Sequence, residues 1–173
     1  MPRKSTPNSY RIVECTAFLT LTNRLGEAID EAIIDLDDLD RVLAAGRWCG
    51  TKGRKGDIYV RLVGSSIRLH RFILDAPNTL FVDHKFHNTL DCRKANLRMC
   101  TNGQNMQNRR GADSDSTSGI RNVYWLRSCE RWIVQLRKDG KKYDFGSFRS
   151  LEDAAEVALK ARAALFDYSV PES

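Results

Sequence analysis

The stretch FVDHKFHNTLDCRKANLRMCTNGQNMQNRR, residues 81–110, decides the fold and the chemistry that we expect of this sequence. It contains two histidines, two aspartates and five asparagines, and between residues 93 and 110 it carries five lysines and arginines but no acid. Histidine transfers protons near neutral pH, carboxylate and amide oxygens bind hard divalent cations, and lysine and arginine contact phosphate. One segment therefore combines the groups that hydrolysis of a phosphodiester requires.

The local pattern of this stretch predicts a strand, a long turn, a second strand and a helix. The two strands and the turn between them are expected over residues 80–84, 96–100 and 85–95, respectively. Thr101 and Gln104 have the spacing of a capping box, which predicts that the helix begins at this point.

This order of elements can bring Asp83, His84 and Asn105 to one point. Neighbouring residues of a strand point to opposite sides of the backbone, so Asp83 is expected to face a metal ion and His84 the attacking water. An isolated Asp-His pair is more often a surface feature or a structural histidine in the core. The chemical interpretation therefore depends on the whole pattern and not on the pair alone.

Six residues of the pattern, in this order along the chain, carry a resemblance to the HNH endonucleases of the homing and phage type: Asp83, His84, Asn96, Leu97, Arg98 and Asn105. The resemblance implies a ββα-metal fold. It implies that Asp83 and Asn105 bind a divalent cation, Mg²⁺ or Mn²⁺, that His84 is the general base, and that Asn96 holds the long turn through backbone hydrogen bonds. Phe86 and Cys92 depart from the residues that are common at their positions.

Further cations near this motif are candidates for contact with phosphate. Beside a nuclease centre, phosphate contact is a better interpretation of these residues than a solvated charged face. For His70, a structural role competes with phosphate contact. The expected contacts are His70, Arg93, Lys94, Arg98, Arg109 and Arg110.

Composition limits the possible classes of protein. The chain has 173 residues, 42% of them hydrophobic, which suits one medium domain or two small ones. Its net charge of +6 fits an anionic partner. The acids gather between residues 14 and 57, and the positive excess lies after residue 93. A field of this kind steers nucleic acid toward the C-terminal part of the chain.

The cysteines and the N-terminus bear on the cellular compartment. Five cysteines without a C-x-x-C pair favour reduced thiols in a cytoplasmic protein. The resemblance to the HNH endonucleases implies that the cell is a bacterial or phage-infected one. A structural zinc site with Cys92, Cys100 and a histidine is the alternative. The N-terminal residues lack an apolar signal region, and no apolar run reaches membrane-spanning length, so we expect no membrane partner. Residues 1–13 are polar and are expected to be a loose tail.

The segment GADSDSTSG, residues 111–119, is small and polar and predicts a linker over 111–118. We therefore expect one domain over 14–110 and a second over 119–170, with three strands and a helix. Asp139-Gly140 is a strong hairpin signal, and Ser150 is an expected helix N-cap. In the first domain, residues 66–74 are expected to be a strand that turns helical around His70.

Strand periodicity in the second domain separates two faces of its sheet. One face holds Trp132, Val134 and Leu136, which are expected to pack against the helix. Arg131, Gln135 and Arg137 are then left to the other face. The segments SGIRNVYW, RWIVQLRKDGKKYDFGSF and EDAAEVALKARAALF resemble the ethylene-response-factor (AP2-like) type of DNA-binding domain. The resemblance implies a sheet in the major groove. The expected DNA contacts are Arg121, Tyr124, Arg131, Gln135, Arg137 and Lys142.

The sequence thus predicts an α+β protein: a ββα-metal HNH domain followed by a three-stranded antiparallel sheet with one helix. The expected function is metal-dependent hydrolysis of double-stranded DNA, without a small-molecule substrate. The alternative is a catalytically inactive DNA-binding regulator that retains the HNH fold. An RNA-directed function has little support, because no RNA-recognition motif is present. The oligomeric state is open, and a monomer is favoured.

Overall fold

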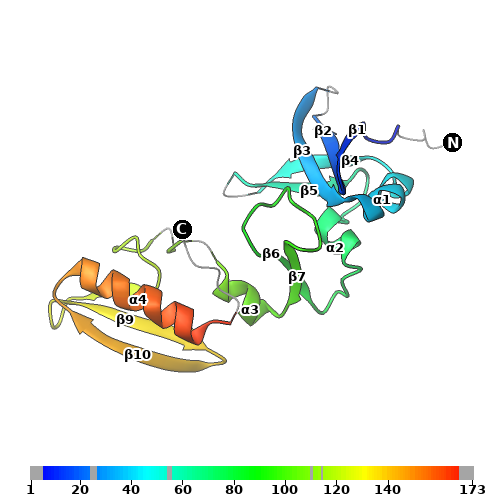
Figure 1. Ribbon diagram of the computed structural model, residues 1–173. Helices are drawn as coiled ribbons and strands as arrows, with labels where there is room; N and C mark the ends of the chain where they lie inside the picture. Colours follow the sequence, from blue (N-terminus) through cyan, green and yellow to red (C-terminus); the bar gives the residue numbers. More distant parts are fainter. Residues whose placement is uncertain (1–5, 24–26, 54–55, 110, 114, 168–173) are drawn as a thin grey trace. The chain divides into compact units, whose positions relative to one another are not determined.

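The chain folds into two compact units, residues 1–100 and 101–173. The computed structural model describes residues 6–23, 27–53, 56–109, 111–113 and 115–167. Small antiparallel sheets and a few helices make up both units, so the protein is of mixed α+β class (Figure 1). Each unit has its own hydrophobic core.

The first unit contains seven strands and three short helices among its described residues. The strands are β1 (Tyr10–Val13), β2 (Thr16–Thr22), β3 (Ala28–Asp35), β4 (Trp48–Lys52), β5 (Ile58–Leu62), β6 (Phe81–His84) and β7 (Leu97–Cys100). The helices are the 3₁₀ helix η1 (Leu36–Asp38), α1 (Leu39–Ala45) and α2 (Leu69–Ile73).

The strands of this unit pair as β1-β2-β3, β4-β5 and β6-β7. In β2 every second side chain is buried, as a half-buried strand requires, and Ala17, Leu19 and Leu21 are fully buried. They join the core around Trp48 and Leu69. Residues 66–74 were expected to be a strand that turns helical around His70. The helical turn is confirmed as α2, which buries Leu69, whereas the strand is reduced to a single antiparallel bridge between Arg68 and Arg61.

The N-terminal residues are more ordered than the expected loose tail. Tyr10–Val13 pairs with β2 as β1. Asn8 is buried, and its amide nitrogen donates hydrogen bonds of 2.8 Å to the carbonyl oxygens of Thr20 and Trp48. Its amide oxygen accepts one of 2.7 Å from the Trp48 N–H. The expectation of a loose tail over 1–13 is therefore wrong from Asn8 onward, because these contacts tie the segment to the core.

The second unit contains helix α3 (Asn102–Gln107), strands β8 (Val123–Leu126), β9 (Arg131–Lys138) and β10 (Lys141–Phe148), and helix α4 (Leu151–Leu165). The strands form an antiparallel sheet in the order β10-β9-β8. Helix α4 lies across β9 and β10 (Figure 1). Its alanines, Ala154, Ala158 and Ala161, pack against Val134 and Leu136, as the alternation predicts.

Arg121 explains why α3 belongs to the second unit. Its guanidinium donates hydrogen bonds to the carbonyl oxygens of Met106 (2.6 Å), Gln107 (2.9 Å) and Arg109 (2.6 Å), at the C-terminal end of α3. In turn, Arg162 of α4 donates to the Arg121 carbonyl at 2.9 Å. The division at Cys100 and Thr101 thus lies ahead of the linker that the composition of 111–118 suggests.

No described helix is both long and apolar enough to cross a membrane.

Candidate functional site

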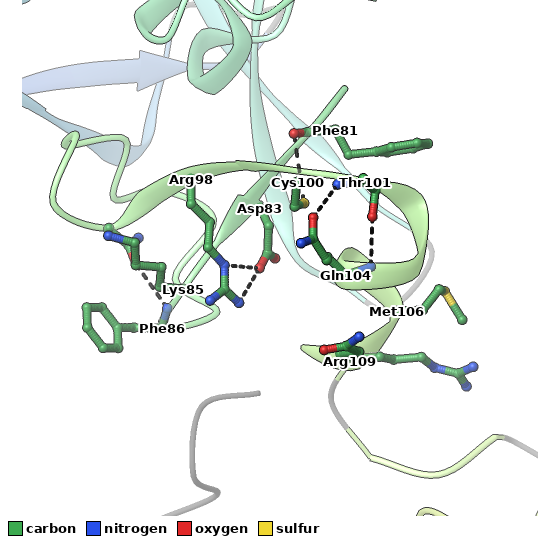
Figure 2. A network of polar contacts seen from close by, with 12 residues as sticks. Phe81, Asp83, Lys85, Phe86, Arg98, Cys100, Thr101, Gln104, Met106 and Arg109 are labelled. Carbon is green, nitrogen blue, oxygen red and sulfur yellow. Dashed lines mark hydrogen bonds and ion pairs between the residues drawn. The ribbon is translucent and has the colours of Figure 1, made fainter. Parts of the chain in front are cut away.

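Asp83 and Arg98 form a partly buried ion pair on β6 and β7. The two residues lie directly opposite each other in the antiparallel register. Both Nε (3.0 Å) and Nη2 (2.8 Å) of Arg98 donate to Oδ2 of Asp83 (Figure 2). The pair is mostly shielded from water, with side-chain exposures of 12% for Asp83 and 19% for Arg98. The guanidinium therefore sets the orientation of the carboxylate that is expected to bind a metal ion.

His84, the next residue on β6, lies in a buried aromatic cluster. Its ring is 4.9 Å from the ring of His70 and 6.3 Å from that of Tyr59, both in edge-on arrangement. Its Nε2 is 4.0 Å from the Cys92 thiol. Tyr59 comes from β5, His70 from α2 and Cys92 from the long turn, so three separate segments surround the imidazole.

Burial keeps both histidines neutral at physiological pH. It lowers the pKa of His84 to about 4, although the charges of Asp83 and Asp91 oppose the shift. Burial also lowers the pKa of His70 to about 3, with further contributions from the charges of His84 and two arginines. Neutral His84 has a lone pair that can accept a proton. His70 is 5% exposed, as is His84, and lies beside it in the same buried cluster.

These two pKa values predict that acid destabilises the protein well before its carboxylates titrate. In the unfolded chain both histidines regain a pKa near 6.5, so the unfolded state binds more protons, and stability falls as the pH drops from 6.5 toward 4. We expect the free energy of unfolding to fall by about 2 kcal/mol per histidine between pH 6.5 and 5. Urea denaturation across this range measures the change. A constant stability down to about pH 5 would contradict the prediction, because ordinary carboxylates stay ionised there.

Asn96 organises the long turn between β6 and β7. Its side chain is 3% exposed. The amide nitrogen donates to the carbonyl oxygens of Asp91 (2.7 Å) and Asn88 (3.2 Å), and the amide oxygen accepts from the Phe86 N–H (3.0 Å). A turn without regular pairing needs such bonds, because its buried main-chain groups have few other partners.

Replacing Asn96 by alanine should destabilise the first unit by about 3 kcal/mol, because three main-chain groups lose their hydrogen bonds in a buried site. Chemical denaturation measures the loss. The matched control is Asn88→Ala, which removes one exposed side-chain bond to the Leu90 N–H and should cost less than about 1 kcal/mol. Equal losses for the two variants would show that Asn96 does not support the turn.

The long turn is also tied to β3. The Ile33 N–H donates to the Leu90 carbonyl at 2.9 Å, and the Cys92 N–H donates to the Ile33 carbonyl at 2.8 Å. Cys92 is fully buried, which raises the pKa of its thiol. Cysteine at this position thus acts as a small apolar residue that packs beside His84. Within the described part of the chain, no group of three His, Cys, Asp or Glu side chains is placed to hold a metal ion.

Helix α3 places Asn105 in the second unit. The helix begins with the predicted capping box: Thr101 Oγ1 accepts from the Gln104 N–H (3.3 Å), and Gln104 Oε1 accepts from the Thr101 N–H (2.8 Å), as Figure 2 shows. Asn105 lies one position later, with a half-buried side chain. Its amide offers the oxygen that a hard cation accepts.

The basic residues of the motif are mostly paired with acids inside their own unit. Arg93 donates to Asp91 through Nη2 at 2.7 Å, and Lys94 Nζ is 2.8 Å from Asp38. In the second unit, Arg109 is paired with Asp113. The remaining expected contact, Arg110, lies outside the described residues. Contact with phosphate would require these cations to exchange or share their acidic partners.

The sheet of the second unit has a face that α4 does not cover, which we call the open face. It comprises Tyr124, Leu126, Arg131, Ile133, Gln135, Arg137, Lys142, Asp144 and Ser147. Arg137 and Lys142 are exposed and lie opposite each other on β9 and β10. The Tyr124 hydroxyl donates to Gln135 Oε1 at 2.8 Å, and Gln135 Nε2 donates to Asp144 Oδ2 at 3.1 Å. The face therefore combines exposed cations with an ordered polar row.

Two residues differ from the expected set. Arg121 is engaged with the end of α3, and its guanidinium lies 5.6 Å from the Phe166 ring, so it has a structural role and not an open-face position. Asp144 was not among the expected residues. The hairpin signal could have identified it, since the register around Asp139-Gly140 places Asp144 opposite Gln135.

A comparison with curated proteins gives a relative along nearly the whole chain. The chain is 23% identical over 175 residues to an uncharacterized HNH endonuclease of Acanthamoeba polyphaga mimivirus. The aligned region covers 97% of this chain and 87% of that protein. This likeness supports an HNH nuclease family. No protein-family model matches the chain, and no solved structure matches it.

The likeness to a protein named an HNH endonuclease can be compared with the described geometry. Asp83 and His84 are adjacent on β6, and Asn96 holds the turn that follows them. Asn105 is carried by α3 of the other unit. A partly buried carboxylate next to a neutral imidazole offers an anionic ligand and a proton acceptor in consecutive residues.

Proposed function

We propose that this chain is a metal-dependent endonuclease of the HNH type that hydrolyses phosphodiester bonds in double-stranded DNA. The similarity to a protein named an HNH endonuclease supports the nuclease class. The observation that carries the proposal is the neutral, buried His84 immediately after Asp83, whose carboxylate is oriented by Arg98.

His84 is the proposed general base. It takes a proton from the water that attacks phosphorus, which a neutral imidazole can do because its lone pair is available. Tyr59, His70 and Cys92 keep the ring in one position, which limits the reorganisation that proton transfer would otherwise require. The buildup of negative charge around the scissile phosphate would strengthen the basicity of the imidazole.

Asp83 and Asn105 are the proposed ligands of Mg²⁺ or Mn²⁺. A carboxylate and an amide oxygen fit a hard divalent cation. When bound, such an ion neutralises charge on the scissile phosphate and on the departing 3′ oxygen. Arg98 holds the Asp83 carboxylate through one oxygen, Oδ2. Its guanidinium also adds positive charge for phosphate binding.

The open face of the second unit is the proposed DNA-reading surface. A sheet can enter the major groove of B-form DNA, and arginine and glutamine side chains make base-specific contacts there. The open face supplies such side chains in Arg131, Gln135 and Arg137, and Lys142 lies on the same face. Phosphate contacts from lysine give affinity without sequence preference, whereas base contacts select among sequences.

The test is incubation of supercoiled plasmid with the full chain and Mg²⁺, with and without a chelator. We expect nicked or linear product that disappears when the chelator is added. Cleavage that survives the chelator would contradict metal dependence. Binding of plasmid without cleavage under all metal conditions would instead indicate the alternative, a DNA-binding regulator that retains the fold.

A further inference from the structure

A hydrogen-bonded row of three side chains crosses the sheet of the second unit from one edge to the other. It runs from Tyr124 on β8 through Gln135 on β9 to Asp144 on β10. The two side-chain bonds measure 2.8 Å and 3.1 Å. The row lies on the open face, where side chains have no helix above them, and Tyr124 is 39% exposed.

The row fixes the direction of the Gln135 amide. Tyr124 donates to its oxygen and Asp144 accepts from its nitrogen, so the acceptor end points toward β8 and the donor end toward β10. An ionised carboxylate can only accept hydrogen bonds. Rotation of the amide by half a turn would therefore place its oxygen against the carboxylate, which is repulsive. Asp144 decides the orientation, since the hydroxyl of Tyr124 can donate or accept.

The backbone of β10 holds Asp144 in this position. The strand register shifts between Asp144 and Ser147, which marks a bulge. Gly146 has a φ of 110°, a conformation that L side chains rarely adopt, and its N–H donates to Asp144 Oδ1 at 2.9 Å. The bond from Gly146 and the bond from Gln135 lower the pKa of Asp144, so the carboxylate is ionised at neutral pH. One oxygen binds the bulge and the other orients the amide.

A carboxylate is an unusual group for a surface that contacts phosphates, because it repels them. Arg137 and Lys142, the neighbouring pair on the same two strands, point to an anionic partner for this face. The carboxylate is compatible with such a partner if it lies over base edges instead of the backbone. In the major groove, an amide with a fixed donor and a fixed acceptor matches adenine, which presents an N6 amino group beside the N7 acceptor.

We propose that the Tyr124–Gln135–Asp144 row selects adenine at one position of bound double-stranded DNA, with Asp144 as the positioning residue that fixes the direction of the Gln135 amide. This inference rests on the proposed function of the open face. It adds the base that is read, the direction in which it is read and the residue that sets that direction. Tyr124 has the lesser role, because the amide keeps its orientation when only the hydroxyl is lost.

The experiment is selection of bound sequences from a random double-stranded DNA library by the full chain, with a chelator present to prevent cleavage. The informative variant is Asp144→Asn. Its amide oxygen can keep the bond from Gly146, which leaves its NH₂ group facing Gln135 and favours the reversed amide. We expect the adenine preference at one position to fall roughly tenfold or more. Gln135→Ala should remove the same preference, and Asp144→Asn should add nothing in the Gln135→Ala background.

Two matched control variants, Asp139→Asn and Tyr124→Phe, separate the orientation of the Gln135 amide from the loss of a negative charge and from the loss of the Tyr124 hydroxyl. Asp139→Asn removes the same charge from an exposed position of the hairpin turn, where φ is 51° and asparagine is tolerated; its sequence profile should equal that of the wild type. Tyr124→Phe should change the adenine preference less than Asp144→Asn does. A larger effect of Tyr124→Phe would overturn the assignment of Asp144 as the residue that sets direction.

An Asp144→Asn profile identical to that of the wild type would overturn the inference. The affinities of Arg137→Ala and Lys142→Ala then show how far the failure extends. If these variants bind more weakly, the open face contacts DNA and only the role of the row is wrong. If both bind as the wild type does, the open face is not the DNA-reading surface, and that part of the proposed function fails as well.

Discussion

Asp83→Ala is expected to reduce the rate of plasmid cleavage roughly a thousandfold or more. Without this carboxylate the divalent cation, whose charge stabilises the transition state, is no longer held in place. Asn105→Ala should have an effect of the same kind. DNA binding should stay nearly intact in both variants, because neither residue is proposed to contact bases. Cleavage and equilibrium binding of the same plasmid measure the two outcomes separately.

Asp83 also has a structural partner, so its variants need a control for folding. Removing the carboxylate leaves Arg98 in a partly buried site without this acid. Asp83→Asn keeps the volume and one acceptor oxygen while removing the charge, so it should fold better than Asp83→Ala and still fail to cut. Asp57→Ala, at an exposed position of the same unit, should cut normally. Efficient cleavage by Asp83→Asn would show that the charge is not required.

His84→Ala is expected to reduce the cleavage rate by roughly 10²–10⁴-fold, the usual contribution of a general base. Substrate binding should change little, because the imidazole acts on water and not on the bases. Single-turnover kinetics with saturating protein isolate the chemical step. Partial recovery of the rate on addition of imidazole would connect the loss to a missing proton acceptor.

The neighbouring histidine provides the contrast for this variant. His70 lies 4.9 Å from His84, ring to ring, but is equally buried. Substitutions of His70 should act mainly through stability. A conservative His70→Gln substitution should lower the denaturation midpoint clearly and the cleavage rate of the folded protein only slightly. If His84→Ala cuts at the wild-type rate, another group activates the water, and His70 is the first candidate.

The sequence predicted best the features that local chemistry determines. The capping box of Thr101 and Gln104, the Ser150 N-cap and the hairpin at Asp139-Gly140 are all confirmed. Each needs only residues within a few positions of one another. The two faces of β9 followed from alternation for the same reason.

Features that depend on contacts across the chain were not predictable in the same way. Residues 66–74 alternate as a strand does, and only the helical turn expected around His70 is confirmed; Leu69 and Ile73 are spaced for one face of a helix, and burial of both extends it over Leu69–Ile73. The engagement of Arg121 with α3 depends on residues 12 to 15 positions away. The histidine cluster likewise unites three distant segments, so the low pKa of His84 has no signature in the sequence.

The bonds from Arg121 to α3 have a consequence for modular exchange. A chimera that kept residues 1–118 and replaced the remainder by a foreign DNA-binding module would leave three carbonyl oxygens at the end of α3 without these donors. The same helix carries Asn105, so the graft would loosen a proposed metal ligand although the junction is distant from it in sequence. A module exchanged at the division between Cys100 and Thr101 would instead carry α3 together with Arg121 and keep these bonds.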